Sequence, residues 1–400
     1  MPPANTGVAI MADRLRPAWA EIDLGAAQRN ASLLARLVGP SELCAVVKAD
    51  GYGHGAVPLA RAALAGGAGW LAVALVEEGV VLREAGIQVP ILLLSEPPPA
   101  AMEEALACRL APTVYSADGV RALGRAAAAG DFGPVDVHLK VNTGMHRVGA
   151  EPGSTVALAT AIGADPRLRL AALWTHLAVA DGAGRADVDF TRTQLDRFRS
   201  AHDDLLAAGL RPPCRHVANS AGAIAFPEAR LDMVRCGIAL YGLSPTPELA
   251  AQLSDATGGG RLEPVLSLRA QVSMCRWLDT GERPSYGRRR PLEVRSQVAT
   301  IPLGYADGVP RRLFDTAGEV LIGGVRRPLA GVVTMDQIMV DCGPAGHPEV
   351  NPGDEVVLIG RQAGEEITAT EWADRLGTIN YEVVCGIGPR VPRVLVGGDR

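Results

Sequence analysis

The sequence lacks any hydrophobic run long enough to cross a membrane, and it lacks an excess of basic residues. No apolar stretch approaches the roughly 20 residues that a membrane helix needs. The formal net charge is −5, and the longest basic runs, at 288–290 and 311–312, are short. Nucleic-acid binding normally requires a concentrated basic surface. Neither a membrane nor a nucleic acid is therefore an expected partner, and small molecules are.

The sequence also lacks any paired spacing among its cysteines. The seven cysteines are odd in number, scattered, and never spaced C-x-x-C, which argues against a disulfide framework or a zinc site. The first residues, "MPPANTGVAIMADRLRP", have no basic start and only a short apolar middle, so they do not resemble a signal peptide. A start at Met11 would suit the sequence equally well. These features predict a cytoplasmic enzyme.

Up to about residue 243, short β-rich runs alternate with longer stretches that have helical spacing. The β-rich runs are 43–48, 69–74, 90–95, 110–116, 135–141, 169–176, 214–220 and 232–242. Eight such repeats predict an α/β fold, a parallel (β/α)8 barrel of the TIM type. An open doubly wound sheet is the alternative, but the turn after the first run, "ADGYGHGA", is not the G-x-G-x-x-G that usually accompanies it.

After Gly242 the character of the sequence changes. The stretch "LSPTPELAAQLSDATGGG" has proline near its start and three glycines at its end, which is typical of a linker. Beyond it, β-type runs broken by glycine and proline are interrupted by one helix, "TATEWADRLG". Four hundred residues also exceed what one hydrophobic core usually serves. We therefore predict a barrel over 17–243, a linker over 244–260 and a mainly β C-terminal domain over 261–400, with residues 1–16 as a candidate addition to that domain.

Polar residues cluster at the ends of five of the eight β-rich runs. They are Lys48, Lys140, Arg147, His176, Asn219, Ser220 and Arg235, and Gly237 lies beside the last of them. Catalytic residues of a (β/α)8 barrel lie at the C-terminal ends of its strands, so these residues are expected to share one end of the barrel.

Each of these residues has a simpler interpretation when it is taken alone. Lys48 would serve as a solvated strand end, His176 as a hydrogen-bonded core histidine, and Asn219 with Ser220 as a helix cap. Arg235 is harder to explain in this way, because an unpaired arginine inside an apolar strand is costly and needs an acceptor. The joint pattern therefore favours a functional site.

The predicted site is rich in cations and hydrogen-bond donors but has almost no carboxylates, so a divalent metal is not expected. Barrels of this type commonly hold a phosphate after the seventh and eighth strands, where Ser220 and Gly237 lie. A lysine that faces a phosphate site is a candidate for a Schiff base. Pyridoxal 5′-phosphate (PLP) supplies both the aldehyde and the phosphate, and is the cofactor that this pattern favours.

Several longer motifs occur in order between Trp19 and Val394. They are "AVVKADGYGHG", "LKVNTGMHRVG", "HVANSAGA", "VRCGIALYGL", "SYG", "LGYADGVPRR", "TMDQIMVD" and "INYEV…RVPR". Together they make the chain similar to the PLP-dependent alanine racemases over nearly its whole length. The resemblance implies an isomerase that interconverts L-alanine and D-alanine and supplies D-alanine for the cell wall. It also implies a homodimer whose active sites are shared between the subunits.

The resemblance also assigns roles to individual residues. Lys48 corresponds to the lysine that binds PLP covalently and serves as one catalytic base, and Tyr286 to the second base, which the partner subunit contributes. Tyr52 corresponds to a phosphate contact. Arg235 corresponds to the arginine that faces the pyridine nitrogen, and His176 to the histidine that supports it.

Further positions complete the implied site. Ser220, Gly237 and Ile238, with Asn219 beside them, correspond to the remaining cofactor contacts. Arg147, and Met335 from the other subunit, correspond to residues that hold the substrate carboxylate. Lys140 corresponds to a lysine that is often carbamylated and orients this arginine. Tyr305 and Asp336 correspond to the substrate entrance and the nearby wall.

Two positions depart from the pattern of the alanine racemases. Pro389, in "GIGPRVPR", stands where many members have a tyrosine that binds the phosphate. His146 replaces a more usual small residue directly before Arg147. Both departures bear on cofactor affinity and on the range of substrates, and neither concerns the two expected bases.

Other functions remain compatible with parts of the sequence. A racemase of another amino acid, such as serine, could use the same scaffold, because pocket size decides such specificity. A PLP-dependent decarboxylase fits less well, since Tyr286 and Arg235 occupy racemase positions. A non-catalytic PLP-binding protein is an alternative of a different class. Such proteins resemble the barrel alone, so the predicted β domain argues against it.

Overall fold

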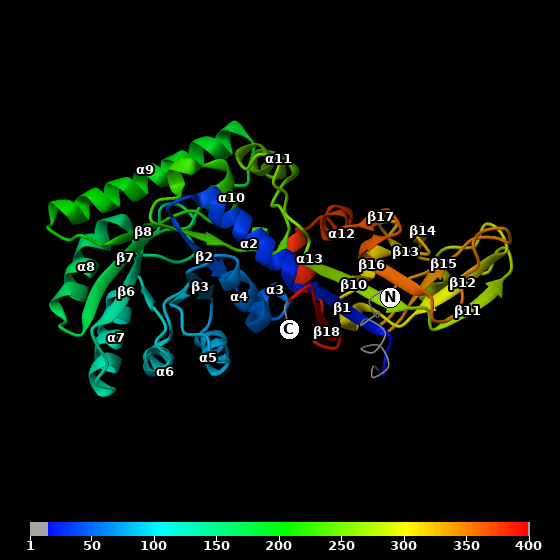
Figure 1. Ribbon diagram of the computed structural model, residues 1–400, viewed down its shortest axis with the longest axis horizontal. Coiled ribbons are helices and arrows are strands. Elements are labelled where there is room, and N and C mark those ends of the chain that lie inside the picture. Colours follow the sequence, from blue (N-terminus) through cyan, green and yellow to red (C-terminus); the bar gives the residue numbers. More distant parts are fainter. Residues whose placement is uncertain (1–14, 399–400) are drawn as a thin grey trace, which may run out of the picture. The chain divides into compact units, whose positions relative to one another are not determined.

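The computed structural model describes residues 15–398, so Met11 and most of the segment 1–16 lie outside the described residues. These residues form two compact units, shown in Figure 1. The first unit, the barrel unit, runs from Leu24 to Glu263. The second, the β unit, combines residues 15–23 with 264–398.

The barrel unit contains an eight-stranded parallel sheet in the order β4-β3-β2-β9-β8-β7-β6-β5. Its strands are β2 (Glu42–Val46), β3 (Trp70–Val73), β4 (Ile91–Leu93), β5 (Thr113–Val114), β6 (Val135–Lys140), β7 (Leu168–Trp174), β8 (Cys214–His216) and β9 (Met233–Cys236). A parallel bridge between Leu92 and Ala111 joins the two end strands, with Leu93 N donating to Ala111 O at 3.0 Å. The sheet therefore closes on itself, and the predicted barrel is confirmed.

Helices surround these strands on the outside (Figure 1). They are α2 (Leu24–Val38), α4 (Ala56–Ala65), α5 (Val76–Glu84), α6 (Met102–Ala107), α7 (Ala117–Ala129), α8 (Thr155–Ala164), α9 (Arg185–Ala207), α10 (Ser220–Ala225) and α11 (Pro247–Ala256). The segment labelled α3 (Lys48–Tyr52) is not a regular helix, because residues 49–52 have left-handed backbone geometry. Helix α7 shows how local sequence sets such an element. Ser116 caps its N-terminus by accepting from Gly119 N, and Val120, Leu123 and Ala127 give it one buried face.

The β unit contains two sheets. The larger follows the order β14-β13-β16-β10-β1-β18, with β17 paired to β16, and the smaller follows β11-β12-β15. The strands are β1 (Ala18–Asp23), β10 (Leu266–Gln271), β11 (Met274–Leu278), β12 (Ser296–Ile301), β13 (Glu319–Ile322), β14 (Val325–Pro328), β15 (Ile338–Asp341), β16 (Glu355–Gln362), β17 (Glu365–Ile367) and β18 (Arg393–Val396). Two helices, α12 (Ala369–Leu376) and α13 (Asn380–Cys385), follow β17. The predicted mainly β C-terminal domain is confirmed.

The division of the chain differs from the sequence-based boundaries at two places. Residues 18–23, expected in the barrel, form β1, which pairs antiparallel with β10 and parallel with β18. The expected linker 244–260 contains helix α11, capped by Thr246 and begun by Pro247. Proline at the first position and glycines beyond the end are common flanks of a helix, so the same residues suit a linker or a short helix.

Within residues 15–398, no helix combines the length and the apolar character that crossing a membrane would require.

Candidate active site

Lys48 begins a turn with unusual backbone geometry directly after β2. Ala49, Asp50, Gly51 and Tyr52 all have positive φ, at 52°, 50°, 60° and 52°, so four successive residues form a left-handed turn. Left-handed geometry costs about 1–2 kcal/mol for each residue that carries a side chain. Three of the four residues carry one, so surrounding contacts must hold the turn in place. One such contact is the Asp50 carboxylate, which accepts from Ala56 N at 2.8 Å.

The turn places Tyr52 beside the segment that follows β9. The Tyr52 ring stacks on Tyr241, with centroids 4.7 Å apart. A Cβ atom on Gly237 would lie 2.5 Å from the Tyr52 hydroxyl oxygen, so a larger residue at 237 would displace the Tyr52 side chain. Ser220 Oγ accepts from Gly237 N at 2.9 Å and from Ala239 N at 3.5 Å. A tyrosine hydroxyl, a serine hydroxyl and backbone N–H groups thus converge at the start of the 3₁₀ turn η4 (Ile238–Tyr241).

Asn219 and Ser220 take different positions at this point. The Asn219 side chain accepts from Gly222 N at 2.9 Å and caps α10, which is the simpler of the interpretations open to it. Ser220 instead joins α10 to the loop after β9, because its hydroxyl contacts residues 237 and 239. Of the two side chains, Ser220 is therefore the one that contacts the backbone N–H groups around the start of η4.

Arg235 lies on β9 and is only 2% exposed. Its Nη2 donates to the carbonyl oxygens of Thr175 at 2.8 Å and Val217 at 3.0 Å, and lies 3.4 Å from His176 Nδ1. Its Nη1 donates to His216 Nδ1 at 2.8 Å. Burial lowers the pKa of Arg235 to about 10, so the side chain stays charged at neutral pH. Carbonyls and imidazoles, rather than a counter-ion, hold this charge.

Two histidines extend the contacts of Arg235 into the barrel. His216 accepts at Nδ1, so its proton lies on Nε2, which is 3.1 Å from His138 Nδ1. Burial and the charge of Arg235 lower the pKa of His216 well below its ordinary value, and burial lowers the pKa of His138 to about 4. Both rings are therefore neutral at pH 7. Arg235 Nη1 donates to His216 Nδ1, and His216 Nε2 donates in turn to His138 Nδ1.

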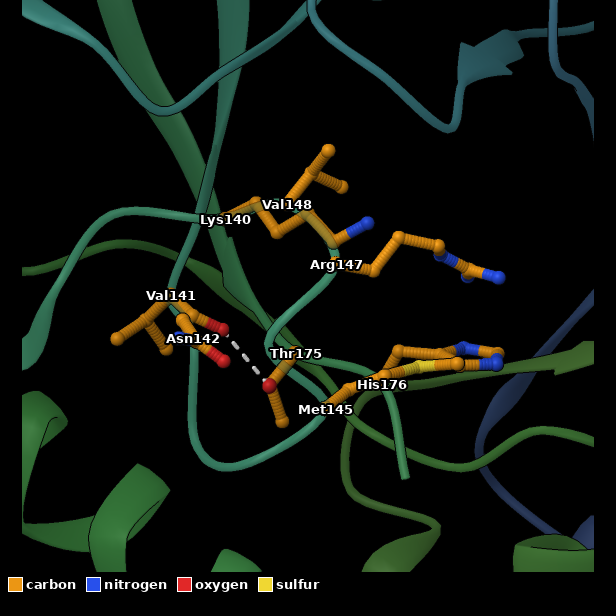
Figure 2. Close-up of a pocket in the computed structure, with 8 residues that line it drawn as sticks. All are labelled: Lys140, Val141, Asn142, Met145, Arg147, Val148, Thr175 and His176. Atoms are coloured by element: carbon orange, nitrogen blue, oxygen red, sulfur yellow. Dashed lines mark hydrogen bonds between the residues drawn. The ribbon is translucent and has the colours of Figure 1, made fainter. Parts of the chain in front are cut away.

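A second group of cations lies beside Arg235 and lines a small pocket with Asn142 and Met145 (Figure 2). Lys140, 4% exposed, donates to Leu94 O at 3.3 Å, and its Nζ lies 4.1 Å from the centre of the Trp174 ring. In Figure 2 the side chains of Lys140, Arg147 and His176 extend toward the same side of the pocket.

The ionisation of this group reflects how closely the cations lie. Burial, then the charges of Arg235, Arg147 and Lys48, lower the pKa of Lys140 to about 7. Burial and the same three cations, with Lys140, lower the pKa of His176 well below its ordinary range. The structure therefore brings Lys48, Lys140, Arg147, His176 and Arg235 into one electrostatically coupled site.

The other predicted residues lie on neighbouring loops of the β unit. Tyr286 is 71% exposed and follows Ser285, which has a φ of 72° and donates through Oγ to Val332 O at 2.6 Å. Tyr305 N donates to Thr334 O at 2.9 Å, next to the exposed Met335.

Asp336, which follows Met335, forms an ion pair with Arg390. Its carboxylate contacts Arg390 at 2.7 Å, and Arg390 also reaches the buried Asp307 at 3.3 Å. Pro389 precedes Arg390, so the position that departs from the resemblance adjoins the loops that carry the predicted substrate-entrance residues.

Comparison with known proteins agrees with this arrangement. The model of the alanine racemase N-terminal domain matches residues 22–245, and that of the C-terminal domain matches residues 265–395. The chain belongs to the alanine racemase family. This confirms the resemblance drawn from the motifs.

Individual members of the family are similar over nearly their whole length. An alanine racemase of Symbiobacterium thermophilum is 48% identical over 97% of this chain and 99% of its own. The crystal structure of alanine racemase from D-cycloserine-producing Streptomyces lavendulae has a TM-score of 0.88 and 38% identity, and covers 96% of this chain and 98% of its own. That from Bacillus anthracis with bound L-Ala-P has a TM-score of 0.87 and 36% identity, covering 96% of this chain and 97% of its own.

His138 and His216 were not predicted as site residues from the sequence. A signal was available for both. His138 lies two residues before Lys140 on one strand, so the two side chains share a face. His216 begins the motif "HVANS", which also contains Asn219 and Ser220. Their role is visible only in the structure, where His216 contacts Arg235 and His138 contacts His216.

Proposed function

We propose that the protein is a PLP-dependent racemase that interconverts L-alanine and D-alanine. The observation that carries this proposal is the combination of Lys48 with converging phosphate donors and a buried Arg235 held by neutral groups. PLP, when bound, makes the α-proton of an attached amino acid acidic. The residues present fit this cofactor. The hydroxyls of Tyr52 and Ser220 and the backbone at Gly237 and Ile238 suit a phosphate, and Lys48 suits the aldehyde.

Arg235 is the residue that favours racemisation over other PLP chemistry. Its guanidinium keeps its proton, so facing the pyridine nitrogen it would donate a hydrogen bond without protonating the ring. His216 and His176 hold the guanidinium in a fixed orientation. An aspartate in this place would instead protonate the nitrogen and favour transamination. The neutral partners of Arg235 therefore support a racemase.

Racemisation needs one base on each face of the α-carbon, one to remove the proton and one to return it. We assign these tasks to Lys48 and to Tyr286 of the partner subunit in a homodimer. The exposure of Tyr286 supports this assignment, because a tyrosine on an exposed, strained turn is available to a second molecule. Met335, Tyr305 and Asp336 of the partner subunit would line the same site.

Arg147 holds the substrate carboxylate in this proposal, and Lys140 orients it. A lysine with a pKa of about 7 is largely neutral just above that pH, and a neutral amine attacks CO2 to form a carbamate with release of a proton. The carbamate would carry a negative charge among Arg147, Arg235 and Lys48. The crowding of cations around Lys140 supports this modification.

The biological setting is also part of the proposal. D-alanine made by the enzyme would supply the cell wall. The odd, unpaired spacing of the cysteines supports a cytoplasmic location.

The first test is to incubate the purified protein with L-alanine in deuterated water. We expect a yellow protein that forms D-alanine carrying deuterium at the α-carbon. A protein that stays colourless with added PLP would overturn the assignment of Lys48. A yellow protein that racemises serine but not alanine would retain the fold and cofactor while replacing the proposed substrate.

The variant Tyr286→Phe tests the assignment of the second base. Tyr286→Phe should bind PLP with unchanged absorbance and lose racemisation by at least about a hundredfold, as expected when a general base is removed. A Tyr286→Phe variant as active as the wild type would contradict the two-base assignment.

A further inference from the structure

Glu78, on helix α5, touches the left-handed turn that begins at Lys48. Its Oε1 accepts from Ala49 N, the amide directly after Lys48, at 2.6 Å. Its Oε2 accepts from Ala74 N at 2.8 Å and from Leu75 N at 3.1 Å. One carboxylate therefore joins the loop after β2 to the loop after β3, and it lies 29 positions from Ala49 in the sequence.

The chemistry of this contact requires a carboxylate. All three partners of Glu78 are N–H donors, and an ionised carboxylate accepts at both of its oxygens. An amide of the same shape presents one oxygen and one N–H2 group, so one of the two loops would face a donor instead of an acceptor. Hydrogen bonds from backbone N–H to a carboxylate are also stronger than those to a neutral group.

The turn that Glu78 contacts has backbone geometry that needs support from surrounding groups. Ala49, Asp50 and Tyr52 carry side chains in left-handed geometry, which an isolated chain rarely adopts. Two hydrogen bonds of the turn, from Gly51 N to Val47 O and from Gly53 N to Ala49 O, join residues close in the sequence. Glu78 instead ties Ala49 to a neighbouring strand–helix loop.

We propose that Glu78 is a positioning residue that holds the left-handed turn and thereby sets the place of Lys48 and Tyr52. The carboxylate does not reach the reacting atoms and acts only through the backbone of residue 49. This inference rests on the proposed function, since it concerns the lysine and tyrosine that we assign to PLP.

The test compares Glu78→Gln with Glu77→Gln in the full-length protein. Glu77 is an exposed carboxylate one residue earlier on the same helix, so its variant controls for the loss of charge. Three quantities are measured: hydrogen exchange of the amides in residues 48–53, the dissociation constant for PLP, and kcat and KM for alanine. Glu78→Ala, which removes all three contacts, serves as the stronger variant.

We expect Glu78→Gln to exchange the amides of 48–53 at least about tenfold faster and to bind PLP roughly tenfold more weakly, as the loss of a charge-assisted hydrogen bond implies. The amides of β6 and β9 should exchange as in the wild type. The value of kcat should fall with little change in KM, because Arg147, which we assign to the substrate carboxylate, lies on another loop.

The outcomes separate this inference from the proposed function. Unchanged exchange and unchanged PLP affinity in Glu78→Gln, relative to Glu77→Gln, would overturn the role of Glu78. Faster exchange with unchanged PLP affinity and kcat would also overturn it. In that case Glu78 would stabilise the turn, but the position of Lys48 would not depend on Glu78. A wild-type protein that binds no PLP would refute the proposed function, and the exchange data would still report whether Glu78 holds the turn. If Glu78→Ala fails to fold, the isosteric Glu78→Gln retains the test.

Discussion

Arg235 lies in the barrel with two carbonyls and two imidazoles around its guanidinium, where a buried arginine more commonly meets a carboxylate. The hydrogen-bond acceptor for Nη1 is His216, whose own proton points to His138. Such a series works only while both rings are neutral, and burial ensures this at pH 7. At the scale of single residues, the position of Arg235 therefore depends on His216, which is itself in contact with His138.

The variant His216→Phe tests this dependence. Phenylalanine keeps the stacking on Trp174 but leaves Arg235 Nη1 without its acceptor. We expect the free energy of unfolding to fall by about 1–3 kcal/mol, the cost of an unsatisfied buried donor. Urea denaturation measures the change, and His202→Asn, on the outer helix α9, is the control. Equal stability of the two variants would contradict the role given to His216.

Lys140 makes stability depend on pH in a defined direction. Its pKa falls from an ordinary 10.5 to about 7 in the folded protein, chiefly through burial. Between these values the unfolded chain binds a proton that the folded protein does not, so the free energy of unfolding rises with pH. Below about pH 7 both states are protonated, and the contribution no longer changes.

We therefore expect the wild type to gain stability relative to Lys140→Met as the pH rises from 7 toward 10.5. Chemical denaturation in CO2-free buffer measures this difference. Parallel stability curves for the two proteins would contradict it. Adding ¹³C-labelled bicarbonate to the wild type should then give a carbamate resonance that Lys140→Met lacks.

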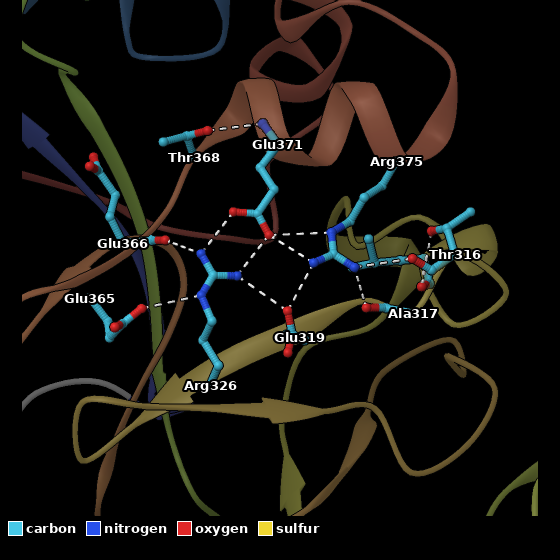
Figure 3. A network of polar contacts seen from close by, with 10 residues as sticks. Thr316, Ala317, Glu319, Arg326, Glu365, Glu366, Thr368, Glu371 and Arg375 are labelled. Carbon is cyan, nitrogen blue, oxygen red and sulfur yellow. Dashed lines mark hydrogen bonds and ion pairs between the residues drawn. The ribbon is translucent and has the colours of Figure 1, made fainter.

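At the scale of elements, helix α12 shows how polar groups fasten one element to another. Arg326 of the β13–β14 hairpin contacts Glu319 at 3.2 Å and Glu371 of α12 at 2.8 Å. Arg375 contacts the same two carboxylates at 2.8 Å and 3.0 Å (Figure 3). Each of the two arginines thus bridges the hairpin and the helix, and the four side chains are only about a quarter to a third exposed. A network of this kind is worth more than an isolated surface pair.

Arg326→Met should lower the free energy of unfolding by about 1–2 kcal/mol, because it removes the cation that contacts Glu319, Glu365 and Glu371 and leaves Arg375 to balance Glu319 and Glu371 alone. The loss should shrink in high salt, which screens the remaining carboxylates. Arg361→Met is the control, since Arg361 makes one ion pair with Glu366 and is 77% exposed. Its effect should stay within about 0.5 kcal/mol. Similar losses in both variants would show that the network adds nothing beyond single pairs.

At the scale of the whole molecule, the proposed homodimer implies that two inactive variants can restore each other. A dimer of Lys48→Ala with Tyr286→Phe would contain one site with both changes and one site with neither. After subunit mixing, roughly a quarter of the wild-type activity should return, since half of the dimers are hybrid and each has one intact site. Activity assays before and after mixing measure this recovery. Mixed subunits that form hybrids without activity would contradict shared sites.

Much of the architecture could be predicted from the sequence. All eight barrel strands overlap the β-rich runs, because alternation and flanking glycines act over a few residues and are legible locally. Other features could not be predicted. The run 18–23 has the same β character as the others, and only its pairing with β10 and β18 assigns it to the β unit. The left-handed turn at Ala49–Tyr52 is equally hidden, since alanine and tyrosine do not favour it.

The sequence by itself therefore determined the strand and helix order, the presence of a second β domain, the family, and the residue types gathered around Lys48. Order along the chain and local periodicity are sufficient for these. Only the tertiary structure decided that His216, in contact with His138, holds Arg235, that Lys140 lies among three other cations, and that Glu78 reaches across to Ala49. The physical reason is that burial, pKa and hydrogen-bond partners depend on groups far apart in the chain, which folding alone brings within reach.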